Sequence, residues 1–377
     1  MTSPARTSKS ASGGEILPFT GVRGVAAWIV VFYHFRFYPS EFGPFDPIVR
    51  NGELAVDLFF IMSGFVLARS YGSRFEHRPS LREFGHFICV RIGRIYPAHL
   101  MVLLLYLLIP IGYDLTERPL PLGHFDPTYY GLSVLLLQNW GFTIGLDWNI
   151  PAWSISAEFL FYLAFPTIVL LIAFARGSKL LLFATGVLLV SSLIMAGSAL
   201  NGLTNDIDRS GALRCLLECS LGVWLCQAVT GREVPLLPSL AATGVSLALW
   251  TVFATGAAPD YMVLPAALAC LLYAVLYPRN PLAVLLSVPI IVAIGRISFS
   301  TYIVHYLVKD VVKMLFVGSQ SMLFVNMIYL GTVLLMSVLM YHLVEQPGHR
   351  RGRSWANALF YPVPRPASVI KPAEQRP

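Results

Sequence analysis

The sequence predicts an all-α protein, a polytopic membrane helical bundle of about ten transmembrane helices. Composition is the first reason, because 56% of the 377 residues are hydrophobic, only 12% are charged and the mean hydropathy is +0.66. The second reason is that apolar runs of about 20 residues, long enough to cross a bilayer as a helix, recur between short polar breaks. A chain with these properties consists mostly of buried or lipid-facing helix.

Each predicted span is an apolar run between polar breaks. In chain order the spans are 18–37, 54–71, 87–112, 153–175, 179–199, 211–229, 236–255, 261–278, 288–308 and 321–343. The first span is retained rather than cleaved, since it contains Arg23 and ends in His34-Phe35-Arg36-Phe37 instead of a small-residue cleavage site. We expect a disordered cytoplasmic N-terminus (1–15), one membrane domain (16–347) and a basic, Pro-rich cytoplasmic tail (348–377). The Glu345-Gln-Pro segment is interpreted as a helix stop.

The distribution of Lys and Arg between loops predicts the orientation. Basic residues gather before the first span and in alternate loops (Arg6, Lys9, Arg74, Arg78, Arg82, Arg176, Lys179), whereas the intervening loops are richer in Asp and Glu. The positive-inside rule then places both termini in the cytoplasm. Nucleic-acid binding is not indicated, because the net charge of +7 is dispersed over loops.

Arg23 and His34 are the most informative pair, because both lie in the first apolar span. Eleven helical positions return to nearly the same face, so the two side chains share that face about 16 Å apart. Ionisable groups at membrane depth usually face a bundle interior and mark a functional path, and imidazole is the commonest proton-transfer group. The alternative is that both side chains snorkel to the headgroups.

Two carboxylates also lie in apolar spans. Asp57 is in the second span, where it either orients an imidazole or caps the helix N-terminus. Glu158, in Trp153-Ser-Ile-Ser-Ala-Glu158, either pairs with an arginine or tunes a catalytic histidine, and we favour the histidine. Ser63-Gly64 is interpreted as a close helix contact rather than a nucleophile.

Arg91 and Arg94 share a helical face at the cytoplasmic entry of the third span. Guanidinium groups suit phosphates, but from this pair alone a lipid-headgroup anchor or a positive-inside signal is the favoured interpretation. Two further groups are expected to be structural: an i,i+4 pair of Arg214 with Glu218, and His305, which is a second possible base but has nearby hydroxyl partners.

The cysteines predict neither a disulfide framework nor a metal site. All five lie in or beside predicted spans. Cys215, Cys219 and Cys226 share one helical face but lack histidine or carboxylate partners at ligand spacing, so we expect no metal.

Six motifs in order resemble acyltransferase family 3, the integral membrane O-acyltransferases. They are FTGVRGVAAWIVVFYHF, GELAVDLFFIMSGFVL, RIGRIYPAH, WSISAEFLFYLAFP, GRISFSTYIVHY and VEQP, and they cover residues 18 to 347. The resemblance implies transfer of an acyl group, often acetyl, from acyl-coenzyme A to a hydroxyl of a glycan or lipid-linked glycan, such as lipopolysaccharide, at the bacterial inner membrane. It makes His34 the essential histidine and Arg23 its partner, assigns Arg91 and Arg94 to the coenzyme A site, and gives Glu158 an acidic motif position.

The mechanism expected from these residues has His34 deprotonating the acceptor hydroxyl, with Asp57 or Glu158 holding its tautomer. A transient acyl-histidine is the alternative. Acyl-coenzyme A is a donor substrate, so no separate cofactor is expected. Two other functions stay open: acylation of a small secreted metabolite such as a macrolide, and proton-coupled transport, which buried Arg, His and Glu would also suit.

Overall fold

The computed structural model describes residues 14–34, 46–76, 80–120, 124–200, 207–316 and 322–362. Within these ranges the regular structure is helical and no strand occurs, which confirms the predicted fold class. In the same ranges seven helices are long and apolar enough to cross a membrane, or eight if the bent pair α13 and α14 is one span. The expected disorder of residues 1–13 and 363–377 lies outside the described residues.

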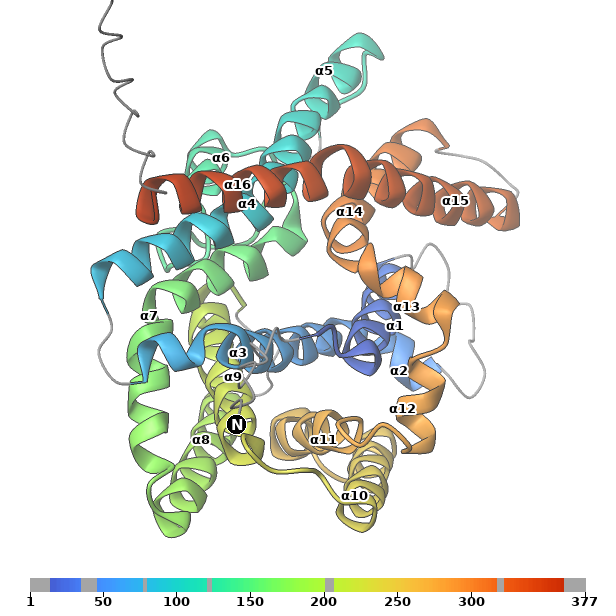
Figure 1. Cartoon of the computed structure of the whole chain (residues 1–377). Helices are drawn as coiled ribbons and strands as arrows, with labels where there is room; N and C mark the ends of the chain where they lie inside the picture. Colours follow the sequence, from blue (N-terminus) through green and yellow to red (C-terminus); the bar gives the residue numbers. More distant parts are fainter. Residues whose placement is uncertain are drawn as a thin grey trace, which may run out of the picture.

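The helices follow one another with few long connections (Figure 1). In chain order they are α1 (Leu17–His34), α2 (Asp46–Arg50), α3 (Ala55–Phe75), α4 (Leu81–Tyr106), α5 (Leu108–Leu115), α6 (Pro127–Val134), α7 (Trp153–Ala175), α8 (Lys179–Ala199), α9 (Ile207–Val229), α10 (Leu236–Ala254), α11 (Asp260–Ala274), α12 (Pro281–Leu286), α13 (Pro289–Arg296), α14 (Ser298–Leu315), α15 (Met322–Met340) and α16 (Gln346–Phe360).

The predicted count of about ten spans is approximate because two predicted spans give less typical membrane helices. α1 has 18 residues, two of which are Arg23 and His34, and it is not among the seven. α11 is apolar but only 15 residues long. Both nevertheless pack inside the bundle, α1 against α13 and α14, and α11 against α10.

Close glycine contacts hold α3 against α9. A Cβ atom on Gly64 of α3 would lie 1.9 Å from the carbonyl oxygen of Cys219, and one on Gly222 of α9 would lie 1.9 Å from that of Ile61. Only glycine permits this approach, because any larger residue would force the helix backbones apart. The expected close contact at Gly64 is therefore confirmed.

The predicted span 288–308 is broken in two. α13 and α14 meet at a bend of 63° around Ile297. Gly295, just before the bend, packs on α1 so tightly that a Cβ there would lie 1.9 Å from the carbonyl oxygen of Thr20. The break thus lets α13 press on the first half of α1 while α14 runs along the rest.

The helix stop expected at Glu345-Gln-Pro is wrong. A π-helical turn, Tyr341–Glu345, joins α15 directly to α16. Pro347 is the second residue of α16 and follows the π-helical turn directly. α16 packs along α4 (Figure 1). Gly352 meets Gly93 and Gly348 meets Pro97 at close range. Residues 346–360 are therefore a docked helix.

Candidate active site

An arginine cluster lies near the Leu17 end of α1. Arg23 of α1 lies within electrostatic range of Arg94 of α4, and Arg91 lies one helical turn from Arg94. α16 adds His349, whose surroundings include the charges of Arg91, Arg94 and Arg353. Three helices thus contribute the cations, and α16 was not expected to take part.

Two of these guanidinium groups have a buried donor without an acceptor. The Nε atoms of Arg23 and Arg91 are shielded from solvent and have no hydrogen-bond partner in the described part of the chain. Arg91 also lies over the ring of Tyr71, 5.5 Å from its centroid. A buried donor without an acceptor is costly, so this cluster suits an anionic ligand.

Carboxylates border the arginine cluster. Glu158 of α7 accepts a hydrogen bond from the Ser63 hydroxyl of α3, and its charge acts on Arg23. Glu345 accepts a hydrogen bond from the Ser300 hydroxyl at 2.6 Å and lies within electrostatic range of Arg94. Glu158 therefore lies beside the arginines, and the expectation that it holds the catalytic histidine is corrected.

A histidine pair lies at the other end of α1. His34 Nδ1 is 3.2 Å from Nε2 of His305 on α14, and the two ring centroids are 5.0 Å apart. His305 is fully buried, and its Nδ1 lies 2.6 Å from the carbonyl oxygen of Tyr302. Sequence analysis expected His305 to be a packing residue, whereas the structure places it in contact with His34.

These contacts decide which nitrogens carry protons when both rings are neutral. A carbonyl oxygen only accepts, so His305 Nδ1 donates to Tyr302 and His305 Nε2 is left as an acceptor. His34 Nδ1 lies 3.1 Å from the carbonyl oxygen of Val30 and 3.2 Å from His305 Nε2, both of which accept, so His34 Nδ1 carries the proton. The lone pair of His34 is consequently on Nε2, which is the nitrogen able to take a proton from a substrate.

The backbone around His305 is anchored to neighbouring elements. The Tyr302 hydroxyl donates to the carbonyl oxygen of Pro151 at 2.9 Å and lies 2.8 Å from Ser154 Oγ of α7. The Asn149 side chain donates to the carbonyl oxygen of Ile303 at 3.1 Å. α14 is thereby fixed to the start of α7, and with it the ring that orients His34.

Asp57 does not hold His34 either. Its carboxylate accepts from Arg214 of α9 at 2.5 Å, and Arg214 Nε also lies 3.5 Å from Glu218. All three side chains are almost fully buried. No capping bond from a side chain occurs at the start of α3. The expected Arg214–Glu218 pair is confirmed. Asp57 also belongs to this buried ion pair, so the expectation that Asp57 holds His34 is corrected.

Sequence reasoning missed His305 as a partner of His34, and Glu345 and α16 as neighbours of the arginines. Charge offered a partial signal, since Asp57 and Arg214 are opposite charges in two apolar spans. No such signal pairs His34 with His305, because neither ring carries a fixed charge.

The fold is a helical membrane bundle in which an arginine cluster and a histidine pair lie near the two ends of α1. A family model described as "Acyltransferase domain" matches residues 19–342. The chain therefore belongs to this acyltransferase family, acyltransferase family 3, whose members transfer acyl groups.

Three similar proteins illustrate the family. The chain is 39% identical over 123 residues to acyltransferase MdmB of Streptomyces mycarofaciens, covering 32% of this chain and 29% of that protein. It is 33% identical over 149 residues to protein 2 in the picA locus of Rhizobium radiobacter, covering 37% and 74%. It is 21% identical over 363 residues to O-acetyltransferase OatA of Staphylococcus aureus, covering 88% of this chain and 57% of that protein. No solved structure matches significantly.

Proposed function

We propose that the protein transfers a short acyl group, acetyl in the simplest case, from acyl-coenzyme A to a hydroxyl group of a cell-surface or exported glycan. The observation that carries the proposal is the arrangement along α1. An arginine cluster with unsatisfied donors lies at one end. At the other end, about 16 Å away along the helix, lies His34, with its Nδ1 against Nε2 of His305.

The arginine cluster is the proposed donor site. Arg91, Arg94 and Arg23 offer guanidinium donors to the phosphates of coenzyme A, a geometry that guanidinium groups suit well. The thiol arm would then extend along the α1 face that Arg23 and His34 share. Its thioester would reach the histidine pair.

His34 is the proposed general base. The acceptor hydroxyl oxygen attacks the thioester carbonyl carbon while His34 Nε2 takes the hydroxyl proton. The C–S bond then breaks, and the proton passes from His34 to the leaving sulfur. The products are an ester of the acceptor and free coenzyme A.

The proposed orientation places the arginine end at the cytoplasm, where acyl-coenzyme A is available. Support comes from the Arg residues of α16. Further support comes from the Lys and Arg residues of the α3–α4 and α7–α8 connections, which lie on the same side in this orientation. With both termini in the cytoplasm of a bacterial cell, the His34 end faces the outer leaflet of the inner membrane.

The direct test is thiol release from acetyl-coenzyme A by purified protein in nanodiscs, with a membrane glycan extract as acceptor. We expect His34→Ala to lower the acceptor-dependent rate by about 10²–10⁴-fold. His342→Ala is the matched control, because His342 is exposed on the π-helical turn.

Thiol release that requires both the acceptor and His34 supports the proposal. Release by folded His34→Ala protein at the wild-type rate contradicts the role of His34. No release from any short acyl-coenzyme A by folded wild-type protein contradicts the function and favours a transporter, which consumes no thioester.

A further inference from the structure

Lys309 is a cation inside the bundle, one helical turn beyond His305 on α14. Its side chain is only 7% exposed. Nζ lies 3.1 Å from the centroid of the Tyr306 ring and 3.8 Å from Asp310 Oδ1. A separation of 3.8 Å is too long for a hydrogen bond, so within the described ranges the ammonium donates to no acceptor atom.

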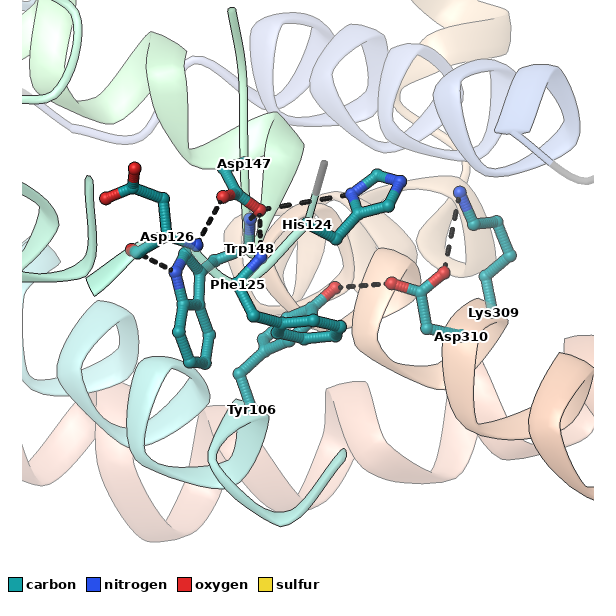
Figure 2. A network of polar contacts seen from close by, with 8 residues as sticks. All are labelled: Tyr106, His124, Phe125, Asp126, Asp147, Trp148, Lys309 and Asp310. Atoms are coloured by element: carbon teal, nitrogen blue, oxygen red, sulfur yellow. Dashed lines mark hydrogen bonds and ion pairs between the residues drawn. The ribbon is translucent and has the colours of Figure 1, made fainter. Parts of the chain in front are cut away.

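Asp310 is held so that one oxygen faces Lys309. The Tyr106 hydroxyl of α4, which is fully buried, donates to Asp310 Oδ2 at 3.2 Å (Figure 2). Oδ1 is the atom nearest Lys309. The Tyr106 hydroxyl therefore fixes the orientation of the Asp310 carboxylate, while the distance from Oδ1 to Lys309 Nζ remains 3.8 Å.

The neighbouring carboxylate, Asp147, differs in having its acceptors filled. Its oxygens accept from the backbone N–H groups of Phe125, Asp126 and Trp148 at 2.6–2.7 Å (Figure 2). His124 Nδ1 lies 3.9 Å away. Asp147 thus fixes the backbone at Phe125 and Asp126. The Lys309–Asp310 pair is the group that we consider for ligand binding.

The pair adjoins the histidine proposed to be the base. The Lys309 ammonium lies over the face of the Tyr306 ring. The His34 ring packs edge-on against the same Tyr306 ring, with the two centroids 5.2 Å apart and an interplanar angle of 84°. Lys309 and His34 are therefore separated by a single aromatic side chain.

We propose that Lys309 and Asp310 form a hydroxyl-binding subsite, which holds the acceptor through a hydroxyl other than the one acylated. An ammonium only donates and a carboxylate only accepts, whereas a hydroxyl does both. One hydroxyl between the two groups satisfies each of them. This proposal rests on the acyl transfer proposed above.

The test compares two small acceptors with acetyl-coenzyme A as donor. Methyl β-D-glucopyranoside has several hydroxyls, and tetrahydropyran-2-methanol has a similar ring with only one. We expect wild-type protein to favour the glucoside in kcat/KM by at least tenfold, since a hydrogen bond to a charged group is worth about that much. Lys309→Met and Asp310→Asn should each reduce this preference about tenfold. Lys179→Met, an exposed lysine on α8, should not.

A second readout needs no donor. The glucoside should raise the melting temperature of wild-type and Lys179→Met protein more than that of Lys309→Met or Asp310→Asn protein. Concentrations up to about 100 mM cover weak binding. An unchanged preference in both subsite variants, no preference in wild type, or the same thermal shift in every variant overturns the subsite. Failure of the proposed function appears separately, as no thiol release from any short acyl-coenzyme A by folded wild-type protein.

Discussion

At the scale of single residues, His34 takes its orientation from another histidine rather than from a carboxylate. The buried His305 ring donates to the Tyr302 carbonyl and so presents an acceptor to His34 Nδ1. A neutral partner fixes the tautomer without burying a charge, and burying a charge in an apolar bundle is costly. The proposed base thus keeps its lone pair on Nε2.

This relation gives a prediction at His305. His305→Phe keeps a ring of similar size but removes one of the two acceptors of His34 Nδ1 and leaves the Val30 carbonyl oxygen. We therefore expect kcat to fall about 10-fold through looser orientation of the His34 ring. His305→Gln offers an amide oxygen to His34 and should recover most of that loss. The measurement is acyl transfer at saturating donor and acceptor, with melting temperatures to confirm folding.

Equal loss in the two His305 variants would show that the ring acts only by packing. Loss confined to His305→Phe, with both variants folded, supports the hydrogen bond from His34.

At the scale of elements, the arginine cluster depends on the docking of α16 on α4. Gly352 and Gly93 meet so closely that a Cβ on Gly352 would lie 2.6 Å from Gly93 Cα. The other end of α16 is also fastened, because His86 of α4 donates to Asn357 at 2.9 Å. Docking brings His349 and Arg353 toward Arg91 and Arg94.

We therefore expect Gly352→Ala to push α16 away and to raise the KM for acyl-coenzyme A several-fold, with a smaller effect on the KM for the acceptor. Gly331→Ala on α15 is the control, because no atom lies within 4 Å of its added Cβ. An alanine there favours the helix by about 0.5–1 kcal/mol. Steady-state kinetics with each substrate varied in turn distinguishes the two effects, and an unaltered donor KM in Gly352→Ala would contradict the role of α16.

At the scale of the whole molecule, the arginine cluster and the histidine pair lie near opposite ends of α1. Under the proposed function, their membrane sides determine where donor and acceptor enter. The proposed orientation places α16 at the cytoplasm and the start of α6 outside. Ser354 of α16 and Thr128 of α6 are both exposed, which makes them suitable positions for a topology test.

In intact cells, a membrane-impermeant maleimide should label Thr128→Cys but not Ser354→Cys. Permeabilised cells should label both. Wild-type protein measures the background, because its five native cysteines are buried or half-buried. The reverse pattern would invert the topology and place the arginine cluster outside.

Much of the fold was predictable because it depends on contiguous residues. Trp153–Ala175 and Lys179–Ala199 form as the hydropathy of the sequence predicts. The bend at Ile297 and the continuation through Pro347 were not predictable, since both depend on packing against α1 and α4. The arginines and His34 could be named from the sequence, but not the neighbours that surround them.

The sequence by itself determined that this is a helical membrane protein and that Arg23 and His34 share one face of its first helix. Span length, hydropathy and helical periodicity are local properties, so one segment contains all the information. Only the tertiary structure decided the partners: Asp57 with Arg214, 157 positions apart, and His34 with His305, 271 positions apart. Such pairs depend on which helices pack together, and helix packing is fixed by close contacts such as those of Gly64, Gly222 and Gly295 rather than by the residues that pair.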